Sequence, residues 1–435
     1  MQTQIFMVHK RHLGLRAPTV LAVGFALTIL VGALVLMLPV SAADGQITPF
    51  LDALFTAASA SCVTGLVTVS TAVHWSVFGK CVILLLIQIG GLGFMSVAAI
   101  ASFVLRRTIT LHERMVMSAG LNLSDGGGIV RLTRRVLFGT FIIEGTGAVL
   151  LSCRFVPHYG FPKGITMGVF HAVSAFCNAG FDLMGTPDDP FQSLIGWAED
   201  PLVNITLMAL IVLGGLGFFV WSDVWDKHSF CRLRLHTKIV LTATAGLLLF
   251  GFGWTLLFEW SNPATLGAFD TPHKLLAAAF ESVTLRTAGF NTIDLGALTG
   301  PSQAVSCLLM FIGGSPGSTA GGIKTVTAAV LVLTAISAFC GRTTVSAFGR
   351  TIAPRSIMNA VTLLMAGGVL CLVGACAIAG IEDAPFHQCL FEAVSAFGTV
   401  GVSMGLTPTL AAASRVILIV MMYMGRVGVL TLGVC

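Results

Sequence analysis

The sequence predicts an all-α integral membrane protein in which four units of transmembrane helix, pore helix and transmembrane helix surround one ion pore pseudo-fourfold. Three observations lead to this fold class. Of the 435 residues, 55% are apolar and 10% are charged, whereas soluble domains carry about 25% charged residues. Apolar stretches long enough to cross a bilayer recur eight times, and a short glycine-terminated segment recurs four times between them. Soluble enzymes and nucleic-acid-binding proteins are therefore excluded.

The predicted spans follow from the lengths of the apolar runs. They cover residues 17–39, 81–105, 136–153, 203–221, 239–258, 304–339, 358–380 and 412–434. The first run has 23 residues, which is longer than the roughly 7–15 apolar residues of a signal peptide. The sixth run contains five glycines and a proline between Gly313 and Gly322. A continuous helix does not tolerate that composition, so this span is expected to be broken.

Basic residues predict the orientation. The N-terminus and every second connection hold sixteen Lys and Arg residues, and the alternate connections hold only Lys80, Arg154, Lys163 and Lys274. Cytoplasmic loops carry the excess of Lys and Arg, so a multi-pass chain with both termini in the cytoplasm is expected. The alternate connections, which this orientation places outside the cell, carry most of the acidic residues. These acids either concentrate cations near an entrance or are there only because outer loops lack the Lys and Arg excess of cytoplasmic loops. The eleven cysteines are expected to be reduced thiols packed as small apolar side chains.

The repeated segment lies in each outer connection and is too short to span. It begins with a phenylalanine and ends with a glycine, as in residues 55–65, 170–180, 280–289 and 391–401. The terminal glycines are 115, 109 and 112 residues apart, close to a quarter of the chain, which indicates an internal repeat. The predicted units are residues 1–105, 106–222, 236–340 and 355–435, and the third contains the broken span. The alternative is that the segments are four small-residue helix-packing motifs.

Each segment is expected to form a re-entrant half-helix followed by an extended strand. Non-helical backbone at membrane depth occurs only where it is buried in protein or lines a water-filled path. Four such strands around one axis can present rings of carbonyl oxygens, which replace the water shell of K+ in ion filters, and glycine allows the positive φ that this backbone needs. The predicted ion-binding residues are Val63, Thr64, Gly65, Asn178, Ala179, Gly180, Thr287, Ala288, Gly289, Thr399, Val400 and Gly401. The strands carry no ring of carboxylates, so a bare monovalent cation is expected, with no organic cofactor.

Three stretches carry a family resemblance: Leu285–Asn291, Gly313–Thr325 and Gly425–Gly428. Together with the four glycine-terminated segments they resemble the Trk/Ktr/HKT superfamily of potassium transporters, and most of all the bacterial Ktr-type membrane subunit. The resemblance implies potassium uptake through a pseudo-fourfold pore in each protomer, a homodimer in the lipid bilayer, and control by a cytosolic ring of nucleotide-binding RCK domains. It leaves Na+ stimulation open. Only the fourth strand keeps the channel-like Thr-Val-Gly, and the other three depart from it.

The broken span predicts a gate just inside the filter. The gate residues are Gly313, Gly314, Ser315, Pro316, Gly317, Ser318, Thr319, Ala320, Gly321 and Gly322, together with Lys324 and Arg426. The alternative is a kinked helix that fits around its neighbours. The loop matches GxSxG and partly matches a P-loop, but neither match has the preceding strand that the chemistry requires. No enzyme activity is therefore expected.

Several buried charges need partners, because a charged side chain in a span is costly. Arg426 either faces the pore and raises the barrier for cations or snorkels to the cytoplasmic surface. Arg286 is expected to brace the third filter strand from behind, with Glu281 and Glu392 as candidate partners. Lys324 either pairs with an acid or lies near the inner surface. Glu144 must be paired or protonated, and His171 is expected to be a packing residue.

A secondary carrier with alternating access, coupled to Na+ or H+, is the second functional hypothesis. Carriers of that kind are built from inverted repeats, whereas the four segments here run in the same sense. The channel-like pore is therefore favoured over the carrier.

Overall fold

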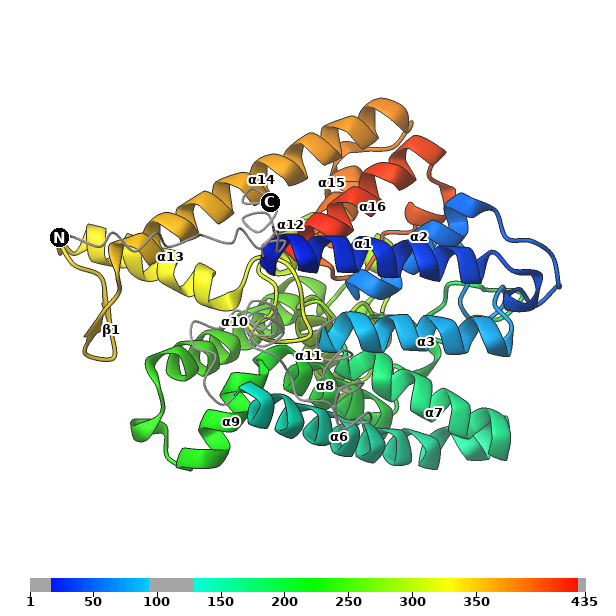
Figure 1. Cartoon of the computed structure of the whole chain (residues 1–435), viewed down its shortest axis with the longest axis horizontal. Coiled ribbons are helices and arrows are strands. Elements are labelled where there is room, and N and C mark those ends of the chain that lie inside the picture. The colour runs from blue at the N-terminus through cyan, green and yellow to red at the C-terminus, as the bar shows by residue number, and fades with distance from the viewer. Residues whose placement is uncertain (1–16, 94–128, 429–435) are drawn as a thin grey trace, which may run out of the picture.

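The computed structural model describes residues 17–93 and 129–428, and the chain is mostly helical there (Figure 1). Four long apolar helices coincide with the first, third, fifth and seventh predicted spans: α1 (Ala17–Leu36), α6 (Ile129–Tyr159), α10 (Leu235–Glu259) and α14 (Pro354–Ile381). Among the described residues these are the four helices long and apolar enough to cross a membrane, and a fifth crossing results if one bent helix pair is counted as a span.

Each long helix is followed by the helix of a repeated Phe-to-Gly segment, called here a pore helix after its predicted role, and then by another helix that is shorter than the long one. The pore helices are α2 (Phe50–Cys62), α7 (Phe161–Phe176), α11 (Thr271–Thr284) and α15 (Phe386–Gly398). The shorter helices are α3 (Val77–Leu92), α8 (Pro201–Leu216), α12 (Gly300–Phe311) and α16 (Ala412–Val427). Every pore helix packs against the long helix that precedes it, so each buries one face against its own segment of the chain.

The predicted fourth span, residues 203–221, is wrong as a continuous helix. Helix α8 ends at Leu216, and α9 (Phe218–Lys227) leaves at an angle of 92°. Gly217 has φ of +94°, which a helix cannot contain and which glycine adopts without steric cost. Gly93 and Gly428 also have positive φ, at +82° and +91°, directly after α3 and α16. The parts of the second and eighth predicted spans beyond these glycines lie outside the described residues.

The sixth predicted span is broken as expected. Helix α12 ends at Phe311, and α13 (Thr325–Phe339) begins after an irregular loop. From Ile312 to Lys324 the backbone forms turns and irregular structure and contains no helix. A kinked helix would keep its hydrogen-bond ladder through the bend, so the kinked-helix alternative does not describe this segment.

The first and last helices meet in space. Helix α16 packs against α1 and α2, so the red and blue ends of the described chain lie side by side (Figure 1). The Tyr423 hydroxyl donates to the Ala22 carbonyl at 2.7 Å, and Arg415 Nη1 lies 2.7 Å from Asp52 Oδ1. These contacts close the arrangement of helices on itself.

The connections add short elements. The 3₁₀ helices are η1 (Pro39–Ser41), η2 (Ile195–Trp197), η3 (Phe230–Arg232), η4 (Leu266–Ala268), η5 (Leu295–Ala297) and η6 (Thr407–Thr409). A hairpin of β1 (Ser346–Ala347) and β2 (Arg350–Thr351) joins α13 to α14, with Ser346 opposite Thr351. The ten cysteines in the described part of the chain are all free.

Burial follows the pattern of a protein that faces lipid. Large apolar side chains on the long helices are exposed, among them Phe141, Leu257 and Val373, whereas many Ser and Thr side chains around the pore helices are fully buried. Such an apolar outer surface would be unfavourable in water but matches the hydrocarbon core of a bilayer. The chain is a multi-pass membrane protein.

Candidate ion filter and the loop beneath it

Each repeated segment ends in a triplet of irregular backbone, called here a filter strand after its predicted role, and the four triplets share an unusual conformation. The first residue of each triplet has positive φ: +59° at Val63, +60° at Asn178, +67° at Thr287 and +50° at Thr399. The terminal glycines also have positive φ: +100° at Gly65, +68° at Gly180, +84° at Gly289 and +92° at Gly401. Three of the non-glycine residues are β-branched, for which this region is strained. Such strain persists where the surroundings enforce it, typically at functional sites.

The middle residue of each triplet is hydrogen-bonded back to its own pore helix. The backbone N–H groups of Thr64, Ala179, Ala288 and Val400 donate to carbonyls of Ser59, Ser174, Thr284 and Ser395 at 2.7–2.9 Å. The N–H groups therefore face away from the neighbouring strands. Because the pore helices end no more than two residues before the strands, their carboxyl ends place partial negative charge at the filter.

The four strands lie next to one another in cyclic order. A Cβ added at Gly65 would lie 2.6 Å from the Ala179 oxygen, and one at Gly180 would lie 2.8 Å from the Ala288 oxygen. One at Gly289 would lie 2.8 Å from the Val400 oxygen, and one at Gly401 would meet the Thr64 oxygen. The carbonyls of the four middle residues therefore line the contacts between successive strands, and no side chain fits at the glycines.

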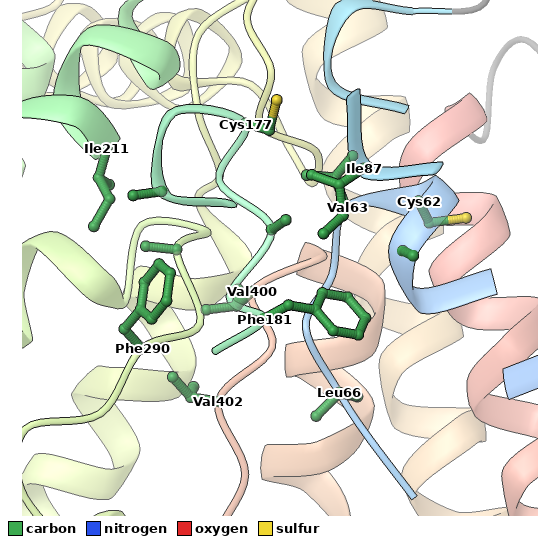
Figure 2. Packing of buried hydrophobic residues seen from close by; sticks show 14 of the residues in the cluster. Cys62, Val63, Leu66, Ile87, Cys177, Phe181, Ile211, Phe290, Val400 and Val402 are labelled. Carbon is green, nitrogen blue, oxygen red and sulfur yellow. The ribbon is translucent and has the colours of Figure 1, made fainter. Parts of the chain in front are cut away.

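A group of buried apolar side chains directly follows the four filter strands, and the sequence analysis did not predict this group. The residue after each glycine is large and buried: Leu66, Phe181, Phe290 and Val402. Figure 2 shows these four side chains around the strands, together with Val63 and Val400. The signal in the sequence was a bulky apolar residue at the same place in all four repeats.

The loop of residues 313–322 docks on the broken end of α8. Ser315 N donates to Gly215 O at 3.0 Å, Thr319 N donates to Gly214 O at 3.3 Å, and Phe218 N donates to Gly317 O at 2.9 Å. The loop is closed at its neck, where Thr325 N donates to Gly314 O at 3.0 Å. It is therefore an ordered element seated on a neighbouring helix end.

The same loop touches the filter. Thr319 Oγ1 lies 3.2 Å from Asn178 Oδ1, and Asn178 Nδ2 donates to Thr287 Oγ1 at 3.3 Å. A Cβ added at Gly321 would lie 2.9 Å from Thr399 Cγ2. The loop thus contacts the first residues of the second and fourth triplets directly and is linked to the third through the amide of Asn178.

Arg426 lies beside the loop and is partly buried. Its guanidinium donates to the carbonyls of Thr319, Gly90 and Gly91, so it joins the loop to the end of α3. The snorkelling alternative is therefore not what the structure shows. The ammonium group of Lys324 donates to the Ala320 carbonyl of the loop at 2.8 Å, and among the described residues the expected ion pair with an acid is not formed.

The expected partners of Arg286 are wrong. Its Nη2 donates to the Gly313 carbonyl at 3.1 Å and to Thr325 Oγ1 at 3.0 Å, so it holds both ends of the loop neck. Glu392 instead accepts bonds from its own strand and turn, at Ser403, Met404 and Thr407. The carboxylate of Glu281 has no hydrogen-bond partner among the described residues. Glu281 is near Arg286 in the sequence, but the fold brings the Gly313 carbonyl and the Thr325 hydroxyl to the guanidinium instead.

Glu144 and His171 both support the second filter strand. Gln88 Nε2 donates to the two Glu144 oxygens at 3.2 Å, and Cys177 Sγ lies 3.8 Å from Glu144 Oε1. His171 Nδ1 bonds the Met167 carbonyl at 2.7 Å, and Nε2 accepts from Leu183 N at 3.3 Å. Glu144 is hydrogen-bonded to a neutral amide and contacts a thiol, and His171 is a packing residue that ties the pore helix to the strand after the filter.

A family model described as TrkH, cation transport protein, matches residues 10–435. The chain belongs to the TrkH family. This TrkH family protein is 43% identical over 414 residues to the Ktr system potassium uptake protein B of Bacillus subtilis, covering 95% of this chain and 91% of the relative. It is 41% identical over 415 residues to the potassium/sodium uptake protein NtpJ of Enterococcus hirae, covering 94% and 90%.

The fold is similar to that of a solved member of the same family. The potassium transporter TrkH from Vibrio parahaemolyticus superposes with a TM-score of 0.73, covering 98% of this chain and 86% of that chain at 17% identity. At that identity the likeness concerns the fold alone.

Proposed function

We propose that this chain is the ion-translocating membrane subunit of a potassium uptake system with a channel-like pore. The observation that carries the proposal is the cyclic contact of four strands whose middle carbonyls lie against neighbouring glycines. Oxygen rings of this kind can replace the hydration shell of K+. The printed names of the relatives, potassium uptake and potassium/sodium uptake proteins, point to the same ion.

In this proposal the twelve residues of the four triplets, from Val63–Gly65 to Thr399–Gly401, bind K+ through backbone oxygens. The units 1–105, 106–222, 236–340 and 355–435 form the four sectors of the pore. The protein works as a homodimer with both termini in the cytoplasm, and a cytosolic RCK ring controls it. The names of two relatives, Ktr system potassium uptake proteins B and D, support a system of more than one subunit.

The loop of residues 313–322, with Lys324 and Arg426, is proposed to be the gate. It contacts filter residues on one side and is held by Arg426 on the other. A cytosolic partner opens the pore by favouring a state in which these contacts are lost. To do so, the partner must bind that open state more tightly than the closed state.

Deleting residues 315–321 tests the gate. We expect K+ uptake to rise about tenfold, because opening no longer requires the loop's contacts to be broken. The hydrogen bond from the charged Arg426 to Thr319 alone contributes about 1.5 kcal/mol or more, and this free energy corresponds to about a tenfold change in the open population. The measurement is the initial rate of K+ uptake per inserted protein. An unchanged rate in protein that folds and inserts would reject the gate.

The proposed function itself is tested by complementation. A bacterium deficient in K+ uptake is grown at low K+ with this chain alone and with an RCK-type cytosolic subunit. We expect rescue that increases with the partner. No rescue by protein shown to be in the membrane would favour a carrier for another cation.

A further inference from the structure

A buried hydroxyl occupies the same place in all four pore helices. It is the fifth residue of each repeated segment, counted from the phenylalanine: Ser59, Ser174, Thr284 and Ser395. All four residues are 0% exposed. Their neighbours in the segments vary, whereas a hydroxyl is kept at this position in every repeat.

Each of these hydroxyls bonds the strand at or just after the filter glycine. Ser59 Oγ accepts from Gly65 N at 3.0 Å. Ser174 Oγ donates to Phe181 O at 2.7 Å, and Thr284 Oγ1 donates to Phe290 O at 2.6 Å. Phe181 and Phe290 directly follow the filter glycines of their strands.

Ser395 makes both kinds of bond. Its hydroxyl accepts from Gly401 N at 3.2 Å and donates to Val402 O at 2.6 Å. Its backbone carbonyl also accepts from Val400 N at 2.9 Å. Three consecutive residues of the fourth strand are therefore fixed by one serine.

These bonds oppose a specific distortion. Each strand alternates between left-handed and ordinary backbone, which is strained at its non-glycine residues. A peptide that is not held on its outer side can rotate and turn its carbonyl away from the neighbouring strand. In the first and fourth strands the hydroxyl accepts from the N–H of Gly65 or Gly401, which shares a peptide with the ring carbonyl of Thr64 or Val400, and a buried N–H left without a partner is unfavourable. In the second and third strands the hydroxyl fixes the carbonyl of the residue after the glycine, so it holds the strand just beyond the ring.

We propose that Ser59, Ser174, Thr284 and Ser395 are positioning residues for ion selectivity, which hold the filter carbonyls at the spacing that prefers K+. The inference rests on the proposed function, because it assumes that the four strands select the ion. The four hydroxyls contribute unequally: Ser395 makes two bonds to the strand through its hydroxyl, and the other three make one each.

The first pore helix offers a matched pair for the test. Ser59 and Ser61 both lie in α2 and are both 0% exposed. The Ser61 hydroxyl has no hydrogen-bond partner within the described chain. Ser59→Ala and Ser61→Ala therefore remove the same atom from the same helix, and only the first removes a bond to the filter.

The experiment compares the affinity for K+ with that for Na+ in the purified full-length protein by calorimetric titration. It is followed by the uptake of both ions in K+-depleted cells that contain the cytosolic subunit. For Ser395→Ala, which removes two hydrogen bonds to the strand, we expect the preference for K+ over Na+ to fall about tenfold. For Ser59→Ala, which removes one, we expect it to fall about threefold, because the loss of each buried hydrogen bond makes the K+-selective arrangement of the carbonyls less favourable. Ser61→Ala and Ser395→Thr should keep the wild-type preference, since Thr284 shows that a threonine hydroxyl reaches its strand from this position.

The outcomes separate the inference from the proposed function. Wild-type preference retained in both Ser59→Ala and Ser395→Ala overturns the inference, as does an equal loss in Ser61→Ala. Wild-type protein that does not prefer K+ overturns the proposed function and the inference with it. If Ser395→Ala does not insert, Ser59→Ala decides the inference, because it removes the bond to Gly65 N and Ser61→Ala is its control.

Discussion

Replacing Arg426 by glutamine is expected to raise K+ flux in the absence of the cytosolic partner by about tenfold or more. In the structure the guanidinium bonds the Thr319 carbonyl of the loop and the Gly90 and Gly91 carbonyls at the end of α3. A hydrogen bond from a charged group contributes about 1.5–3 kcal/mol, so losing the one to Thr319 shifts the loop toward release by at least about tenfold. The measurement is partner-independent K+ flux into liposomes that contain the purified protein.

Arg426→Lys separates two reasons for such an increase. Lysine keeps the positive charge but lacks the planar fork that reaches several carbonyls at once. If the arginine acts by holding the loop, the lysine variant should be nearly as leaky as glutamine. If it acts by its charge in the ion path, the lysine variant should stay closed. Flux in Arg426→Gln no higher than in wild type would exclude both roles.

Gly289→Ser is expected to abolish the preference for K+ and to reduce K+ uptake about tenfold or more. A Cβ at this position would lie 2.7 Å from Gly180 Cα and 2.8 Å from the Val400 oxygen, and Gly289 has φ of +84°. Neighbouring backbone, which cannot swing aside as a side chain can, must therefore shift. A left-handed residue with a side chain also costs about 1 kcal/mol or more, and the displaced carbonyl belongs to the oxygen ring.

A serine at Gly246 is the control for the Gly289 variant. Gly246 lies in α10, in the same predicted unit, and a Cβ there meets nothing within 4 Å. Gly246→Ser should keep both the uptake rate and the ion preference of the wild type. The two variants are compared through the ratio of K+ to Na+ uptake per inserted protein. Wild-type selectivity in Gly289→Ser would show that the third strand is not part of the filter.

The parts of the fold that depend on local sequence could be predicted. The long apolar runs gave the long helices, and the repeated Phe-to-Gly segments predicted where backbone must leave the helix. The break at Gly217 was missed, although Gly-Gly-Leu-Gly occurs at both 90–93 and 214–217. Leucines around these glycines kept the apolar run intact, so hydropathy alone gave no signal.

The partners of the buried groups could not be predicted in the same way. Arg286 binds the Gly313 carbonyl, which is 27 residues away, and Arg426 binds carbonyls more than 300 residues away. Any residue type supplies a backbone carbonyl, so the sequence carries no mark of such a partner. The serine and threonine of the pore helices did carry a mark, their fixed place in the repeat, but their role appeared only with the strand beside them.

The contact between α16 and the first two helices bears on how the protein is made. A ribosome releases α1 and α2 early, and chains acquire their structure in the order of synthesis. Helix α16 carries Arg415 and Tyr423, which bond Asp52 and Ala22, and it is the last helix described along the chain. A partly synthesised chain in the membrane therefore has an open side where α16 belongs. Arg426 also lies on α16, so the loop of residues 313–322 lacks the guanidinium that bonds its Thr319 carbonyl until that helix is in place.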